Sequence, residues 1–261
     1  MATRTHFIGL IPAAGRATRM GDLPFSKELL PLANNSQLPK DLETDSPVAI
    51  DFALKTLCDA GVDETCIVIA PGKWDIPAHT GDGSRSGQSI AYVLAEASPS
   101  VPASLDAAWL LTRDRQVVLL FPDIVFSPRQ AVNSIVAASK ESDADLILAL
   151  VPTSSGEKID IVAVTDDGQV ETVTPKPGKE HSGWTWVAAT WNPEFSAFLH
   201  TMARNVTDIA AREMYVADVI NAAIDAGLSV RALSFPVGTS FDLGTPDELQ
   251  EFWTSEHAQP V

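Results

Sequence analysis

Short runs of β-branched and aliphatic residues alternate with longer amphipathic stretches along the chain. The apolar runs predict strands at His6–Ile11, Thr65–Ala70, Ser89–Leu94, Gln116–Phe121 and Asp145–Val151. The helical patterns between them predict helices over Pro47–Ala60, around Ala103–Leu111 and over Pro128–Ser139. Strands separated by helices of this length indicate βαβ units. We therefore expect an α/β fold with a mixed, mostly parallel sheet.

The second half of the chain continues this alternation after one interruption. Val164–Val173 reads as a hairpin, because an Asp- and Gly-rich turn separates two alternating strands. The pattern then predicts a strand at Trp184–Trp191, helices from Pro193 and over Met214–Ala226, a last strand at Leu228–Phe235 and a closing helix at Thr245–Thr254. No internal repeat or linker is visible, so we expect residues 1–261 to form one domain.

Composition narrows the classes of function and the compartment. The 261 residues are 45% hydrophobic, which is enough for a sizeable core. The net charge of −16 argues against non-specific nucleic-acid binding, which needs a basic face. No signal peptide and no bilayer-spanning run is visible, so we expect a cytoplasmic protein without a membrane partner. Cys58 and Cys66 lie outside CxxC or metal spacing and are predicted to be reduced core thiols.

Small residues and cations gather directly after the first predicted strand. The loop from Pro12 to Pro31 contains Ala13, Ala14, Gly15 and Ala17, followed by Arg19 and Lys27. Ligands of open parallel sheets bind beyond the carboxyl ends of the strands, and small residues let backbone N–H groups approach phosphate oxygens. The loop fits neither G-x-G-x-x-G nor G-x-x-x-x-G-K-[ST]. The loop is therefore either a phosphate site or a surface loop with scattered cations.

The stretches "PAAGRATRM" and "PFSKELLPL" resemble the entry loop of the nucleoside-diphosphate-sugar pyrophosphorylases, which are sugar-1-phosphate nucleotidyltransferases. The motifs are most similar to those of the family members that use glucose 1-phosphate with dTTP or UTP. Ala14 and Ala17 stand where the family usually has glycine. The resemblance implies catalytic roles for Arg19 and Lys27. It implies nucleotide contacts for Pro12, Ala13, Ala14, Gly15 and Thr18.

Further motifs follow in the family's order. "TGDGSRSGQSIAYVLAE" (Thr80–Glu96) resembles a stretch that leads to the nucleotide base, and Ala95 takes the place of a base-reading glutamine. Asp123 after an apolar strand, and Asp242 in "FDLGTP", match the family's two Mg²⁺ ligands. Hard oxygen ligands suit this ion, although a lone Asp after a strand is also a common turn or helix cap. His79 and His181 have no partners at metal spacing and are predicted to be loop residues.

The second half carries the motifs for the acceptor. In "VTPKPGK", Lys176 matches the lysine that contacts the sugar phosphate, while Pro175 replaces a glutamate that normally contacts the sugar. Asp218 matches an aspartate that either binds the sugar or, here, simply faces solvent. Trp184 and Trp186 either alter the sugar pocket or serve as packing. The polar stretch 33–46 is longer than usual and carries no predicted role.

The resemblance implies a single nucleotidyltransferase-type, Rossmann-like domain, with residues 6–150 mainly nucleotide-binding and 151–261 mainly sugar-phosphate-binding. The implied reaction joins an NTP and a sugar 1-phosphate into an NDP-sugar with release of pyrophosphate and uses Mg²⁺. Glucose 1-phosphate with dTTP or UTP is the expected pair. A cytidylyltransferase for another phosphorylated alcohol and a catalytically silent nucleotide-binding paralogue remain as alternatives. Assembly into a homo-oligomer is left open.

Overall fold

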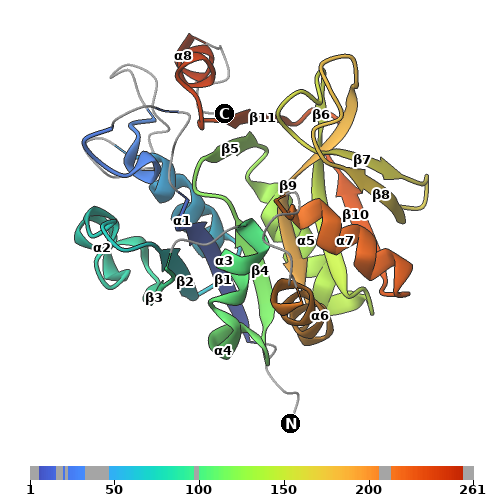
Figure 1. Cartoon of the computed structure of the whole chain (residues 1–261), viewed down its shortest axis with the longest axis horizontal. Coiled ribbons are helices and arrows are strands. Elements are labelled where there is room, and N and C mark those ends of the chain that lie inside the picture. Colours follow the sequence, from blue (N-terminus) through green and yellow to red (C-terminus); the bar gives the residue numbers. More distant parts are fainter. Residues whose placement is uncertain are drawn as a thin grey trace.

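The computed structural model describes residues 6–15, 20, 23–32, 47–96, 100–205 and 213–254. A mixed sheet forms its centre, with the strand order β10-β6-β9-β4-β1-β2-β3 (Figure 1). Strand β9 is antiparallel to both neighbours, and the other adjacent pairs are parallel. This confirms the predicted fold class. The strands are β1 Phe7–Ala13, β2 Glu64–Ile69, β3 Ser89–Leu94, β4 Gln116–Leu120, β6 Leu146–Thr153, β9 Gly183–Trp191 and β10 Val230–Ser234.

The first strand is longer than the sequence pattern predicted. It continues to Ala13, so Pro12 and Ala13 belong to the strand and not to the loop. Strand β4 pairs with β1 only as far as Leu10, whereas β2 pairs along the whole end of β1. A proline is tolerated at this point because one edge of the strand no longer has a neighbour to bond.

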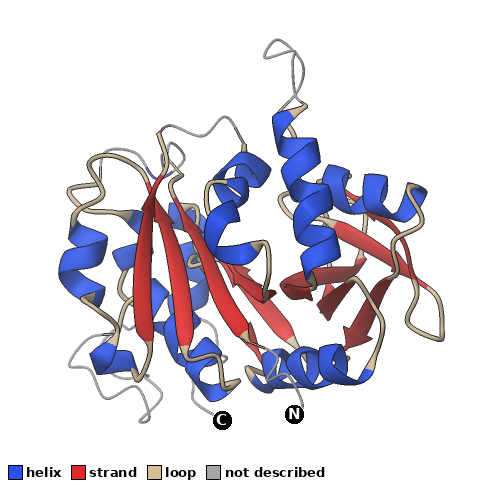
Figure 2. Cartoon of the chain, turned by 90° about the horizontal axis from the view of Figure 1, so that it is seen from below, coloured by secondary structure: helices blue, strands red, loops and turns tan. Residues whose placement is uncertain are grey.

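Helices cover both faces of the sheet, as Figure 2 shows. Helices α1 (Ala49–Asp59) and α5 (Gln130–Glu141) pack on one face. The other face carries α3 (Val101–Asp106), α4 (Trp109–Thr112), α6 (Pro193–Arg204) and α7 (Val216–Asp225). The helix predicted around Ala103–Leu111 is therefore two short helices. Apolar side chains on both sides of the strands make two core clusters, which is why the parallel strands read as continuous apolar runs.

Several short elements were not predicted, and two of them shape the candidate site. Strands β5 (Ile124–Ser127) and β11 (Thr239–Asp242) form a separate antiparallel pair, which lies with α8 (Pro246–Thr254) at the top of Figure 1. Four-residue strands are too short to give a clear period. Also unpredicted are η2 Lys27–Leu29, α2 Asp75–Thr80 and η3 Ser84–Ser86. His79 lies in α2 and not in a loop, which corrects its assignment.

The predicted hairpin is confirmed as β7 (Ile161–Val164) and β8 (Val170–Thr174), at the right of Figure 1. Its turn contains Gly168 with φ +84°, a conformation that glycine adopts without strain. Cys66 is buried and Cys58 is half-buried, and both are free thiols. Among the described residues, none of the helices combines the length and the hydropathy that a bilayer span requires.

Candidate active site at the carboxyl edge of the sheet

The first loop leaves β1 at the carboxyl edge, and its small residues have different environments. Ala13 and Ala14 are buried in the cores on opposite faces of the sheet, so their side chains serve packing. Gly15 is exposed, and a Cβ added there would meet no atom of the described residues within 4 Å. Approach of a ligand to the backbone is therefore open at Gly15. Thr18 and Arg19 lie outside the described residues.

Lys27 and Asp123, which are far apart in sequence, form an ion pair at this edge. Lys27 Nζ lies 2.5 Å from Asp123 Oδ2, and both side chains are about six-sevenths buried. Burial alone would lower the pKa of Lys27, but Asp123 and the nearby carboxylates of Glu28 and Asp242 raise it above its usual value. The ammonium is thus charged at neutral pH and placed among carboxylates.

The pairing of β5 with β11 brings Asp123 and Asp242 together. Asp242 pairs with Ile124, and Leu243 N–H donates to the carbonyl of Asp123 over 2.8 Å. Asp242 Oδ1 also accepts the N–H of Gly244 at 2.8 Å, which fixes the turn into α8. The two carboxylates therefore lie at neighbouring backbone positions, Asp123 directly before β5 and Asp242 at the end of β11.

These two carboxylates fit part of a Mg²⁺ site. Among the described residues, no group of three or more His, Cys, Asp or Glu side chains is arranged to hold a metal. Mg²⁺ commonly binds one or two carboxylates and completes its shell with waters and substrate phosphates. Two aspartates at the carboxyl edge of the sheet match that chemistry.

A buried ion pair that the sequence reasoning did not single out supports the Lys27 segment. Glu28 is fully buried, and Lys73 Nζ lies 2.8 and 2.9 Å from its two carboxylate oxygens. Burial raises the pKa of Glu28, while Lys73 acts in the opposite direction. Asp75 also accepts the Ser26 N–H at 2.6 Å and its hydroxyl at 2.7 Å. These contacts attach η2 to the segment after β2.

The stretch predicted to approach the base lies along β3 and the loop before it. Ala95 N–H donates to Ile69 O at 2.9 Å, and its side chain is buried in the same cluster as Ala14. The structure thus brings Ala95 and Ala14 to the same edge. Tyr92 donates its hydroxyl proton to Gly81 O, and its hydroxyl lies 2.6 Å from Thr80 Oγ1. These bonds connect Tyr92 to the segment before β3, so the structure of that segment accounts for a tyrosine at this position.

A second cluster of charged side chains lies at the open end of the β7–β8 hairpin. Lys176 Nζ is 4.6 Å from the centroid of the Tyr215 ring, and Asp218 accepts the Tyr215 N–H at 2.7 Å in the first turn of α7. Asp218 is therefore a helix-end partner and not a freely solvated residue. Asp160 interacts electrostatically with both Lys176 and Asp218, and it accepts a hydrogen bond from Trp186 Nε1 at 3.1 Å. Sequence reasoning missed Asp160, because a single aspartate before a strand gives no distinctive signal.

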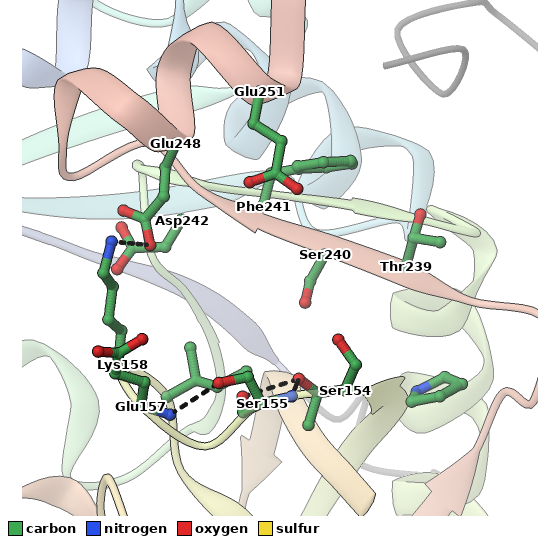
Figure 3. A pocket seen from close by; sticks show the side chains of 13 residues that line it. Ser154, Ser155, Glu157, Lys158, Thr239, Ser240, Phe241, Asp242, Glu248 and Glu251 are labelled. Carbon is green, nitrogen blue, oxygen red and sulfur yellow. Dashed lines mark hydrogen bonds and ion pairs between the residues drawn. The ribbon is translucent and has the colours of Figure 1, made fainter. Parts of the chain in front are cut away.

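A polar cavity of about 400 Å³ lies beside Asp242. Its walls are the end of β6 with the following loop, β11 and α8, and Figure 3 shows Ser154 and Ser240 pointing into it. Lys158 and Glu248 form an ion pair of 3.1 Å across one end. Because Glu157, Asp242, Glu248 and Glu251 line it with one lysine, this cavity does not suit a triphosphate.

Comparisons with known proteins found a related sequence. A curated glucose-1-phosphate thymidylyltransferase of Streptomyces griseus is 27% identical over 231 residues, which is 85% of this chain and 59% of that protein. The chain therefore spans less than two thirds of this relative.

Solved structures share the fold at low identity. A Bacillus anthracis protein designated a glucose-1-phosphate thymidylyltransferase, in complex with sucrose, superposes with a TM-score of 0.79 at 16% identity, covering 94% of this chain and 93% of that one. UDP-glucose pyrophosphorylase with UDP-glucose gives 0.74 at 16% identity, covering 95% and 97%. Inositol-1-phosphate CTP transferase of T. maritima gives 0.72 at 15% identity, covering 95% and 94%.

A family model decides the assignment. The model described as nucleotidyl transferase matches residues 8–258, nearly the whole chain, including the β1 loop, both aspartates and the hairpin. The protein belongs to the nucleotidyl transferase family.

Proposed function

We propose that the protein joins an NTP to a sugar 1-phosphate and releases pyrophosphate, with glucose 1-phosphate and dTTP or UTP as the preferred pair. The observation that carries this proposal is the grouping of Lys27, Asp123 and Asp242 at the carboxyl edge of the sheet. Membership of the family and the motifs of the second half support it.

In the proposed reaction, an oxygen of the sugar phosphate attacks the α-phosphorus of the NTP. The bond from that phosphorus to the bridging oxygen breaks, and pyrophosphate leaves with the electron pair. No covalent protein intermediate is needed, so the protein contributes alignment and charge neutralisation.

The charged side chains have different roles in this reaction. Asp123 and Asp242 would hold Mg²⁺, which when bound neutralises and polarises phosphate oxygens. Lys27 draws charge from the α-phosphate, and Arg19 stabilises the leaving pyrophosphate. Lys176 binds the attacking phosphate, where a single ammonium reduces the repulsion between two anions.

A matrix of NTPs against phosphorylated acceptors tests the proposal. Mg²⁺-dependent pyrophosphate release is measured for ATP, CTP, GTP, UTP and dTTP, each with hexose 1-phosphates and with phosphorylated non-sugar alcohols. We expect release with dTTP or UTP and glucose 1-phosphate. Release with CTP and a non-sugar alcohol would redirect the function to a cytidylyltransferase. Nucleotide binding without release would indicate a silent paralogue.

A further inference from the structure

Asp160 lies at the open end of the β7–β8 hairpin, in a position that the fold alone does not explain. It directly precedes β7, and because Ile161 pairs with Thr174, it lies across the hairpin from the segment that carries Lys176. Helix α7 runs beside this hairpin, at the right of Figure 1, and Tyr215, which directly precedes α7, contacts Lys176. Three separate elements therefore meet around this carboxylate.

The Asp160 carboxylate has an anchor on one side. Trp186 Nε1 donates to Oδ2 over 3.1 Å, and the Trp186 ring is itself buried, with an edge contact to Phe121 at 5.5 Å. Among the described residues, this bond from the indole is the single hydrogen bond of the Asp160 side chain. The second oxygen of the carboxylate is thus available to a ligand.

Lys176, which acts electrostatically on this carboxylate, is positioned by its backbone and by an aromatic ring. It has φ +44°, and it is the one non-glycine residue of the described chain in the left-handed region. Such conformations cost free energy and are concentrated at functional sites. Its ammonium over the Tyr215 ring is further positioned by a cation–π contact. The ammonium of Lys176 therefore has a defined position, from which its charge acts on the Asp160 carboxylate.

The electrostatic environment of Asp160 is unfavourable to its charge. Burial raises the pKa of its carboxyl, and Asp218 acts in the same direction, while the bond from Trp186 and the charge of Lys176 oppose them. By contrast, Asp218 bonds the backbone at the start of α7. Among the described residues, Asp160 makes no comparable bond to the backbone. Its partly buried charge therefore lowers the stability of the fold, and no bond to the backbone compensates for this loss.

We propose that Asp160 is a specificity-determining residue of the acceptor site, which accepts a hydrogen bond from an acceptor hydroxyl next to the phosphate that Lys176 binds. This inference rests on the proposed function. The ligand class is a phosphate monoester with a neutral vicinal hydroxyl. A carboxylate accepts strongly from such a group, whereas it repels a second anionic substituent. Trp186 is a positioning residue that fixes the carboxylate.

Binding calorimetry with two esters tests the proposal independently of turnover. The probes are glucose 1-phosphate and 2-deoxyglucose 1-phosphate, and the variants are Asp160→Asn and Trp186→Phe. Asp166→Asn, at an exposed aspartate in the turn of the same hairpin, is the matched control. We expect Asp160→Asn to weaken glucose 1-phosphate at least about tenfold, the scale of a charge-assisted hydrogen bond, and to change the deoxy ester less than about twofold.

Two further readouts separate specificity from a structural role. The KM for the NTP stays unchanged in Asp160→Asn, and its Tm is equal to or above that of the wild type, because an unfavourable charge is removed. Trp186→Phe shows a smaller loss, again selective for the hydroxylated ester. Equal weakening of both esters, a lowered Tm with loss of NTP binding, or no change would overturn the role of Asp160.

The failure of this inference differs from the failure of the proposed function. If the wild type binds glucose 1-phosphate selectively through Asp160 but releases no pyrophosphate with any NTP, the proposed function is wrong and the inference stands. If pyrophosphate is released and Asp160→Asn binds both esters as the wild type does, the inference is wrong and the function stands. If the wild type binds neither ester, the assignment of this cluster is overturned.

Discussion

Lys27 is the described cation most closely engaged with the two predicted metal ligands. Replacing it by methionine keeps the length of the side chain and removes the charge. We expect Lys27→Met to lower kcat/KM for the NTP by at least about a hundredfold, because an electrostatic stabiliser of the reacting phosphate is lost. Steady-state pyrophosphate release measures this.

Lys55→Met, on the outer side of α1 where Lys55 pairs with Asp59, is the control and should retain wild-type activity. Near-normal kcat/KM in Lys27→Met at saturating Mg²⁺ would remove Lys27 from the catalytic residues.

The buried pair of Glu28 and Lys73 offers a test of how the Lys27 segment is held. Lys73→Met leaves a buried carboxylate without its partner, and we expect a loss of about 3 kcal/mol in the free energy of unfolding. Without Lys73, burial raises the pKa of Glu28 further in the folded variant. The folded variant therefore binds more protons than its unfolded chain between the two pKa values. The loss should therefore be larger at pH 8 than at pH 5.

Urea unfolding at both pH values measures this effect. The double variant Glu28→Gln with Lys73→Met should recover part of the lost stability, because no unpaired charge remains. A pH-independent loss that the double variant does not reduce would contradict the ion-pair explanation.

At the scale of elements, His79 connects α2 to α1. Its Nε2 lies 2.9 Å from Asp51 Oδ1, and this hydrogen bond raises the pKa of His79. A raised pKa in the folded state means that the stabilisation is complete below the ordinary histidine pKa and is lost as the pH rises through the folded-state value. For a partly exposed pair we expect about 0.5 kcal/mol.

Thermal unfolding of His79→Gln between pH 5 and pH 9 checks this prediction. The variant should have a lower Tm than the wild type at pH 5, and the difference should shrink at pH 9. His181→Gln, at an exposed position in a loop, should follow the wild type throughout. A difference that grows with pH would show that the sign of the linkage is wrong.

The arrangement of the short elements also explains how distant motifs form one site. Strands β5 and β11 place Asp123 and Asp242 on adjacent backbone positions, and η2 directs Lys27 toward them. Helix α7 returns toward β10, which is parallel to β6, so its first turn with Asp218 lies near the carboxyl ends of the strands. The sheet edge is thus the common position of both charged groups.

At the scale of the whole molecule, Cys66 reports on the integrity of the sheet. It lies in β2 with its side chain fully buried, and burial raises its pKa to about 12. In a Cys58→Ser variant, Cys66 is the single thiol of the chain. We expect a thiol reagent to label it only at the rate of global unfolding, and the rate should not rise with reagent concentration.

Labelling of Cys66→Ser at Cys58 provides the comparison, because Cys58 is half-buried in α1 and should react faster. Rapid labelling of Cys66 under native conditions would contradict the buried position of β2.

The net charge of the molecule and the charges at the candidate site have opposite signs in part. The net charge of −16 argues against non-specific binding to nucleic acid, yet Lys27, Lys73 and Lys176 each lie against a carboxylate or an aromatic ring at the sheet edge. The global charge is therefore no guide to the chemistry of the site.

The order of strands and helices, the hairpin and the family motifs could be read from the sequence, because apolar periodicity and turn residues act over a few neighbouring positions. The predicted ends of β2, β3, β4 and β9 differ from the structure by at most one residue. Asp123, Asp242, Lys27 and Lys176 were candidates from their motifs, and their roles remain predictions.

Only the tertiary structure decided which side chains meet. The pairing of β5 with β11, the burial of Glu28 against Lys73, and the approach of Asp160 to Trp186 and Lys176 all join residues from distant segments. Local pattern carries no information on such contacts, because strand register and helix packing are set by the whole core. The same burial that fixes these groups changes the free energy of their charges, so Asp160 became a candidate residue only in the folded chain.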